Sequence, residues 1–207
     1  MPSSLSRNLA VLVGVLVLGA VVGAILSGGL VRGQAPSGLA QQDQQLLDEL
    51  VAKDEIREQI YNYSRGLDRM DMELAKQVWH PDGTTNIIGV FEGTGEGWID
   101  WLWETHDPFV GHSHQMMNIL LEVDGDTAVS ETYMTATLRA EPTENSANMT
   151  MVRGRYADRW SKRDGRWAID HRLYTLDFTS GIASTGPNQS VPSRRDRTDP
   201  SYQVYPH

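Results

Sequence analysis

The chain has 207 residues and, once the apolar N-terminal stretch is set aside, enough sequence for one domain with one hydrophobic core. Its formal net charge is -9, from 18 Lys and Arg against 27 Asp and Glu, so a phosphate backbone has no electrostatic reason to bind. We therefore expect no nucleic-acid partner. Cysteine is absent, which excludes disulfides, thiolate catalysis, Cys-ligated zinc and lipoprotein anchoring.

The N-terminal segment from Leu9 to Leu30 is apolar throughout and contains no charged residue. Its length is close to the roughly 20 residues that a helix needs to cross a bilayer, so we predict that residues 1–32 form a single-pass membrane anchor. Arg7 precedes the segment and Arg32 follows it, a pattern that weakly favours a domain outside the cytoplasm. Small residues just after position 32 also resemble a cleavage site, so a cleaved signal peptide and a secreted domain stay open as the alternative.

Residues 33–42 are rich in Gly, Pro, Ser and Gln, the composition of a flexible linker. The domain that follows, over residues 43–180, begins with a predicted helix from about Asp43 to Arg65. Apolar residues along this helix recur mostly at three- and four-residue steps, which places them on one side, facing a core. They are Leu46, Leu50, Ile56, Ile60, Tyr63 and Leu67.

A shorter helix is expected next, with Asp71 as its N-cap and with Leu74 and Val78 on its buried side. The His80-Pro81-Asp82-Gly83 sequence is typical of a turn and ends this helix, so the first two helices form a hairpin. A strand is expected over Thr85 to Phe91, and the Trp-rich run from Trp98 to Trp103 indicates a third helix.

Four strand-like runs complete the domain, and Asp-Gly turns join them in pairs. The runs are His114–Val123, Thr127–Arg139, Met149–Ser161 and Arg166–Phe178, and the turns are Asp124-Gly125-Asp126 and Asp164-Gly165. Helices followed by strands indicate an α+β fold, with about three helices packed on one face of a curved antiparallel sheet. Residues 181–207 show neither the hydrophobic period of a helix nor that of a strand, so we expect them to form a loose tail.

Several fragments, in this order, resemble the SnoaL-like families of the nuclear transport factor 2-like superfamily. They are Glu55-Ile56-Arg57-Glu58-Gln59-Ile60, Leu67-Asp68-Arg69-Met70-Asp71, Trp79-His80-Pro81-Asp82, His114-Gln115-Met116-Met117-Asn118 and Gly154-Arg155-Tyr156-Ala157-Asp158. The resemblance covers roughly residues 46–178. It implies a conical α+β barrel whose bent sheet wraps around the helices and leaves one deep apolar pocket. The chain is most similar to the branch of scytalone dehydratase and bile-acid dehydratase.

The same resemblance implies three catalytic residues, Tyr63, Asp68 and His114. A His and an Asp that meet in an apolar cavity form a base and its orienter, because the imidazole can take a proton near neutral pH and the carboxylate fixes its tautomer. Tyr63 can donate a hydrogen bond to a carbonyl oxygen that becomes enolate-like. A structural role stays open for each, with Asp68 as a helix cap, His114 as a satisfied polar residue and Tyr63 as a packed ring.

Four further residues are predicted to bind the substrate: Asn118, Tyr133, His112 and His171. Asn118 follows His114 at the two-residue period of a strand, and His171 shares a predicted face with Trp167 and Ile169. His112 and His114 could hold a metal together, but the next carboxylate, Glu122, lies at the far end of the strand. We therefore predict no metal site.

Nucleotide, nicotinamide and Gly-x-Ser-x-Gly hydrolase fingerprints are missing from the sequence, so we expect a reaction without a cofactor. The predicted function is that of a dehydratase or isomerase acting on a small hydrophobic carbonyl compound. One alternative is a non-catalytic pocket domain that binds a lipid-like or polycyclic ligand at the membrane. Another is an assembly module whose sheet pairs with a partner or with a second copy in a homo-oligomer.

The anchor prediction can be tested by fractionation. Full-length protein is expected to stay with membranes after a high-salt wash, because salt does not screen hydrophobic insertion. A truncated protein that begins at Gln41 is expected in the soluble fraction. A mature protein whose N-terminus is found near Pro36 or Gln41 would contradict the anchor and favour a cleaved signal.

Overall fold

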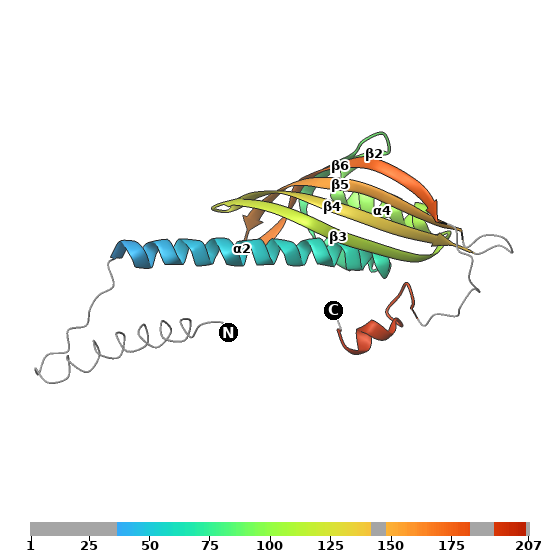
Figure 1. The fold of residues 1–207 in the computed structure, drawn as a ribbon, viewed down its shortest axis with the longest axis horizontal. Helices are drawn as coiled ribbons and strands as arrows, with labels where there is room; N and C mark the ends of the chain where they lie inside the picture. The colour runs from blue at the N-terminus through green and yellow to red at the C-terminus, as the bar shows by residue number, and fades with distance from the viewer. Residues whose placement is uncertain (1–36, 142–147, 183–192, 206–207) are drawn as a thin grey trace, which may run out of the picture. The chain divides into compact units, whose positions relative to one another are not determined.

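The structure, a computed structural model, describes residues 37–141, 148–182 and 193–205 (Figure 1). The chain divides into two compact units, and the second, Leu46 to His207, contains the sheet and the hydrophobic core. The elements in chain order are α2 (Ser37–Asp68), α3 (Met72–Lys76), β1 (Trp79–Ile87), β2 (Phe91–Thr94), α4 (Gly95–His106), β3 (Phe109–Asp124), β4 (Thr127–Ala140), β5 (Met149–Arg163), β6 (Arg166–Ile182) and the 3-10 helix η1 (Pro200–Gln203).

The six strands form one sheet in the order β2-β1-β6-β5-β4-β3, which bends over α4 and the second half of α2 (Figure 1). β3 to β6 pair with one another as antiparallel neighbours, and β2 pairs antiparallel with β1. β1, however, runs parallel to β6, so the sheet is mixed and the prediction of an antiparallel sheet is wrong at this position. The reason is that no hairpin joins β1 to β6, and only a hairpin forces neighbouring strands to run in opposite directions.

The two predicted Asp-Gly hairpins are confirmed. Asp164 and Gly165 join β5 to β6 and both have positive φ, 52° and 78°, which a two-residue type I′ turn requires. Gly125 begins the turn between β3 and β4 with a φ of 57°. These local turns set the register of the sheet, and the register places the inward-facing side chains.

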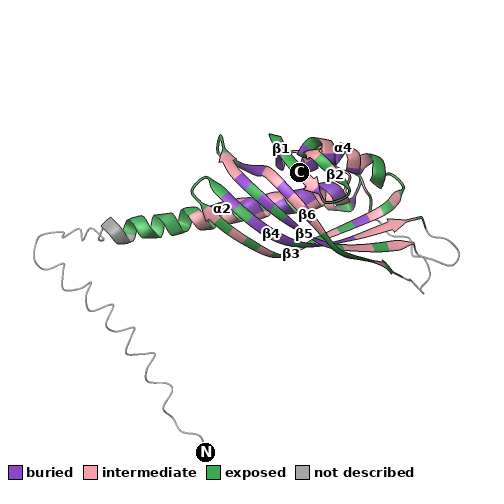
Figure 2. Ribbon diagram, turned by 90° about the horizontal axis from the view of Figure 1, so that it is seen from above, coloured by how far each residue is buried: buried purple, intermediate pink, exposed green. Residues whose placement is uncertain are grey.

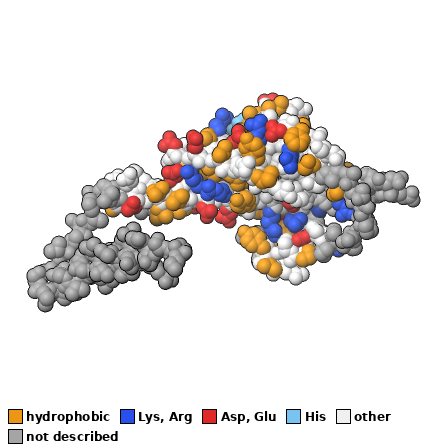
Figure 3. Space-filling model, viewed as in Figure 1, with side chains coloured by type: hydrophobic (Ala, Val, Ile, Leu, Met, Phe, Trp, Pro, Cys, Tyr) orange, Lys and Arg blue, Asp and Glu red, His pale blue; other side chains and the backbone are white. Residues whose placement is uncertain are grey.

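The buried side of α2 begins later than the sequence pattern predicts. Ile56, Ile60, Tyr63 and Leu67 are fully buried, as predicted, whereas Leu46 and Leu50 are exposed. The step from Leu50 to Ile56 is six residues, which at about 100° per residue puts them on different sides of the helix. Figure 2 shows the resulting change from exposed to buried along α2, and Figure 3 shows hydrophobic side chains lying uncovered on its first part.

Among the shorter elements, the structure differs from the prediction mainly in where each helix or strand begins and ends. Asp71 is the N-cap of α3 and accepts a hydrogen bond from the backbone N–H of Leu74 at 3.3 Å, as predicted. The predicted turn at residues 80–83 is an irregularity inside β1, between the paired residues Trp79 and Thr84. The predicted strand over residues 85–91 is a hairpin, because β1 ends at Ile87 and β2 starts at Phe91.

Part of the C-terminal tail packs on the domain, where a loose extension was expected. β6 runs to Ile182, and residues 193–205 contact the end of α2 and the start of α3. Arg197 and Tyr202 both donate hydrogen bonds to Asp71, at 2.8 and 3.2 Å. Arg65 lies over the Tyr202 ring, with its Cζ 4.6 Å from the ring centroid. These contacts come from charged and aromatic side chains, which carry no periodic signal in the sequence.

The predicted membrane anchor, Leu9 to Leu30, lies outside the described residues. Within the part of the chain that the structure describes, no helix is long and apolar enough to cross a bilayer. The anchor therefore stays a prediction.

The assignment of the buried side of α2 predicts a difference between two matched substitutions. Ile60→Ala is expected to lower the free energy of unfolding by about 2–5 kcal/mol, because it removes buried methyl groups and leaves a cavity. Leu50→Ala, on the exposed side of the same helix, is expected to change it by less than about 0.5 kcal/mol. Urea unfolding of the full-length variants measures both, and equal effects would show that the buried side is misassigned.

Candidate active site

The helices and the inner face of the sheet line a half-open cavity of about 290 Å³. This is at the lower end of the roughly 300–1,000 Å³ typical of ligand pockets, so it suits a molecule of one or two fused rings. Most of the side chains that line it are aliphatic or aromatic, and none of its described lining is Lys, Arg, Asp or Glu. The polar groups on its wall are Tyr63, Tyr156, Tyr174, His106, His114 and Thr179.

Asp68 and His114 meet at one wall of this cavity. Asp68 is the last residue of α2, and its Oδ1 accepts a hydrogen bond from Nδ1 of His114, in β3, at 2.6 Å. The backbone N–H of His114 donates to both carboxylate oxygens, at 2.9 and 3.0 Å. Because a carboxylate only accepts, Nδ1 carries the hydrogen and Nε2 is left as the basic nitrogen. The His114 side chain lines the cavity and is only 4% exposed.

Tyr63 is fully buried beside the same cavity, and a hydrogen bond holds its hydroxyl. Trp98, in α4, donates a hydrogen bond from Nε1 to the Tyr63 hydroxyl at 3.0 Å. The Tyr156 ring lies edge-on to that of Tyr63, with centroids 5.8 Å apart, and burial raises the pKa of Tyr156 well above its usual value, so Tyr156 stays protonated. Since its oxygen accepts the hydrogen bond from Trp98, Tyr63 keeps its own O–H as a donor.

A buried ion pair lies behind these tyrosines. Arg172 donates from Nε and Nη2 to the two carboxylate oxygens of Asp158, at 2.7 and 2.8 Å. The Arg172 Cζ lies 4.4 Å from the ring centroid of Tyr63 and 4.0 Å from that of Tyr156. A cation against the ring faces fixes both rings and adds positive potential behind their hydroxyls. A regular hairpin at Asp164-Gly165 would pair Asp158 with His171, so no signal in the sequence indicated the pairing of Asp158 with Arg172, which depends on the register shift in β6.

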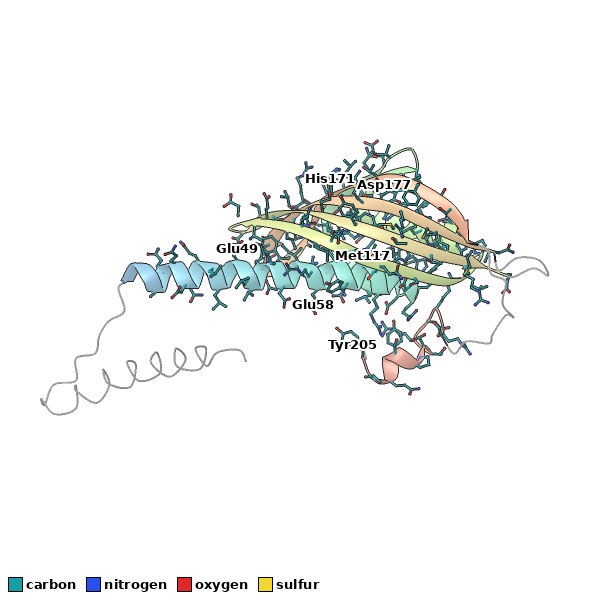
Figure 4. All side chains as sticks on the ribbon, in the orientation of Figure 1. Glu49, Glu58, Met117, His171, Asp177 and Tyr205 are labelled. Atoms are coloured by element: carbon teal, nitrogen blue, oxygen red, sulfur yellow. The ribbon has the colours of Figure 1, made fainter. Side chains whose placement is uncertain are left out.

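Two of the four predicted substrate-binding residues point away from the cavity because a strand changes register. Asn118 has a φ of 46° and lies in an irregularity of β3, between Met117 and Leu120, which turns it to the exposed side. His171 follows a similar shift in β6 that brings Arg172 inside instead. His171 hydrogen-bonds through Nδ1 to the exposed Thr84 at 2.8 Å, on the outer side of the sheet (Figure 4).

The other two predicted substrate-binding residues also lie outside the cavity lining. Tyr133 is exposed on the outer face of β4, where the Arg155 Cζ lies 5.9 Å from its ring centroid. His112 is buried next to His114, with ring centroids 6.3 Å apart, and its Nδ1 is 3.3 Å from the backbone oxygen of Leu67. The structure thus brings together Tyr63, Asp68 and His114 but not these substrate-binding candidates.

His106 is a cavity residue that sequence reasoning missed. It ends α4, and its ring centroid is 4.8 Å from that of His112. Burial and the neighbouring His112 lower the pKa of His106 to about 3, and burial and Arg195 lower the pKa of His112 to about 4. Both rings are therefore neutral near neutral pH. The only signal in the sequence was that His106 lies between a predicted helix and a segment that carries two more His residues, His112 and His114.

No metal centre is evident beside these histidines. In residues 37–141, 148–182 and 193–205, no three His, Asp or Glu side chains gather closely enough to hold a metal ion.

The lowered pKa values of His106 and His112 predict how stability depends on pH. The unfolded chain protonates these rings near pH 6.5 and the folded chain only near pH 3 to 4, so stability falls as the pH drops from about 7 to about 4. Each histidine contributes at most about 1.4 kcal/mol per pH unit. His106→Phe is expected to reduce this loss in urea unfolding, and His171→Asn, on the outer face, is the control. Identical pH dependence in His106→Phe and the wild type would contradict the burial argument.

Solved structures share this architecture. A candidate scytalone dehydratase from Novosphingobium aromaticivorans is 22% identical, with 69% of this chain and 97% of that chain covered and a TM-score of 0.57. A hexachlorocyclohexane dehydrochlorinase from Novosphingobium barchaimii is 17% identical, with coverages of 70% and 99% and a TM-score of 0.59. A protein of unknown function from Mycobacterium tuberculosis is 26% identical, with coverages of 65% and 75% and a TM-score of 0.53. At these identities the likeness shows the fold.

Comparison with curated proteins gives no match. Residues 48–173, more than half of the chain, match the SnoaL-like domain family. This agrees with the predicted resemblance and with the architecture of the solved structures. The chain therefore belongs to the SnoaL-like domain family, within the nuclear transport factor 2-like superfamily.

Proposed function

We propose that this protein is a cofactor-independent dehydratase, or a closely related eliminating or isomerising enzyme, acting on a small hydrophobic carbonyl compound. The observation that carries this proposal is the 2.6 Å contact between Asp68 and His114 at the wall of an apolar cavity. It leaves Nε2 of an oriented imidazole as a base beside a space that suits a ring-bearing molecule.

The residues support a stepwise loss of water from a β-hydroxy ketone. His114 Nε2 removes the proton from the carbon next to the carbonyl, and the electron pair moves onto the carbonyl oxygen. The Tyr63 O–H donates a hydrogen bond to that developing enolate, and Asp68 stabilises the imidazolium. The enolate then reforms its carbonyl as the double bond forms and the C–O bond to the hydroxyl breaks. His114 returns its proton to the departing oxygen, which leaves as water.

The lining of the cavity suits an uncharged substrate. Trp98 and Trp101 stack with ring centroids 5.0 Å apart and planes inclined by 15°, and both line the cavity. Their rings form an apolar wall for a flat or cyclic ligand. Exclusion of water by such a wall strengthens the hydrogen bonds that His114 and Tyr63 make to a reacting molecule.

The names of two proteins with the same fold support an elimination. One is a candidate dehydratase and the other a dehydrochlorinase, names that denote loss of water and of hydrogen chloride. Both losses begin in the same way when a base removes a proton from the carbon next to the one that bears the leaving group. Here the Asp68–His114 pair is the group suited to that step.

Substitution at the pair tests the proposal. A panel of cyclic β-hydroxy ketones and steroid-like ketones, incubated with full-length protein, is expected to include a substrate. For that substrate, His114→Ala is expected to lower turnover by about 10²–10⁴-fold, the usual contribution of a positioned general base. Asp68→Asn is also expected to slow the reaction, and adding it to His114→Ala should have little further effect if the pair acts as one unit.

The matched control for these variants is His171→Ala, because His171 lies on the outer side of the sheet and should leave turnover unchanged. Turnover that survives in His114→Ala would contradict the assignment of the base. Tight binding of panel members with no turnover by the wild type would favour a non-catalytic pocket domain.

A further inference from the structure

His106, at the end of α4, lies at the cavity wall and has no part in the mechanism above. Trp98, Leu102 and His106 follow one another at four-residue steps, which places them on one face of the helix, and all three line the cavity. Within the described residues neither ring nitrogen of His106 makes a hydrogen bond, and neither is buried, unlike Nε2 of the neighbouring His112. These nitrogens are therefore available to a ligand.

The neighbours of His106 hold its ring in place. The ring of Phe109 meets it edge-on, with centroids 5.6 Å apart and planes inclined by 88°, and the ring of His112 packs at 4.8 Å. Arg195, in the C-terminal tail, donates from Nη2 to the backbone oxygen of His106 at 2.9 Å and so holds the end of the helix. A ring fixed in this way loses little side-chain entropy when it binds a ligand.

The charge state of His106 limits what it can bind. Burial and the neighbouring His112 and His114 lower its pKa to about 3, so the ring is neutral near neutral pH. A neutral imidazole has one N–H donor and one acceptor nitrogen. A hydroxyl group can engage either nitrogen, because it both accepts and donates, whereas a ketone or an ether oxygen only accepts. The group that fits His106 best is therefore a hydroxyl.

We propose that His106 binds the hydroxyl group that the substrate loses. The rings of His106, His112 and His114 form one cluster, in which the His112 centroid lies 4.8 Å from that of His106 and 6.3 Å from that of His114. His106 and His114 are the two members that line the cavity. A hydroxyl held by His106 would thus lie near the base, whose proton it takes as it departs.

This inference rests on the proposed function and names its substrate class more closely. His106 transfers no proton, because the proton that leaves with the hydroxyl still comes from His114. A hydrogen bond from His106 instead stabilises the oxygen while its bond to carbon breaks. The substrate is therefore a β-hydroxy ketone rather than a β-chloro compound, since chlorine is a poor hydrogen-bond partner and leaves the imidazole unpaired.

Binding of two matched ketones to full-length protein tests this proposal. The probes are 2,2-dimethylcyclohexanone and 3-hydroxy-2,2-dimethylcyclohexanone, which differ only in the hydroxyl. Their two methyl groups replace the hydrogens on the carbon between carbonyl and hydroxyl, so no water is lost during the measurement. In NMR titrations, His106→Phe is expected to weaken binding of the hydroxy ketone about three- to tenfold, the usual worth of one hydrogen bond, and that of the other ketone less than about twofold.

Further variants complete the design. His171→Phe, on the outer side of the sheet, is the matched control and should leave both affinities unchanged. His106→Leu repeats the test with a smaller side chain, and either His106→Asn or His106→Gln, whose amides keep a donor and an acceptor, should retain part of the hydroxyl-dependent binding.

Equal effects of His106→Phe and His106→Leu on the two ketones, or a wild type that binds neither ketone, would overturn the proposal. Failure of the proposed function looks different. The hydroxyl-dependent difference in binding would then remain, while no hydroxy ketone showed turnover that depends on His114.

Discussion

One carboxylate connects the helical part of the domain to its sheet. Asp68 ends α2 and accepts three hydrogen bonds from His114, two from the backbone N–H and one from the ring. The backbone bonds fix where the end of the helix lies against β3, and the ring bond fixes the tautomer and direction of the imidazole. The same interaction therefore closes one side of the cavity and prepares its basic nitrogen, so local packing and the proposed chemistry depend on the same side chain.

Around this pair, the described lining of the cavity has no Lys, Arg, Asp or Glu, and residues behind the lining contact its polar groups. Trp98 donates a hydrogen bond to the Tyr63 hydroxyl, and the buried Arg172 pairs with Asp158 against the faces of the tyrosine rings. A ligand consequently meets a mostly apolar lining. In such a space a hydrogen bond to a developing enolate is stronger than it would be in solvent.

The sequence predicted those features of the fold that depend on residues close together in the chain. Ile56 to Leu67 marked the buried side of α2, Asp164-Gly165 marked a hairpin, and the order of motifs indicated the family. It failed for Asn118 and His171, because irregular pairing in β3 and β6 reverses which side chains face inward, and a strict two-residue period cannot show that.

The protonation pattern of His114 tests the central claim most directly. Nitrogen-15 NMR of the full-length protein, labelled in its histidines and recorded near neutral pH, distinguishes the two ring nitrogens. The structure predicts a hydrogen on Nδ1, shifted downfield by its short bond to Asp68, and an Nε2 without hydrogen that responds to a ketone placed in the cavity. A hydrogen found on Nε2 instead, or an Nε2 signal that ignores every ligand bound in the cavity, would contradict the assignment of His114 as the base.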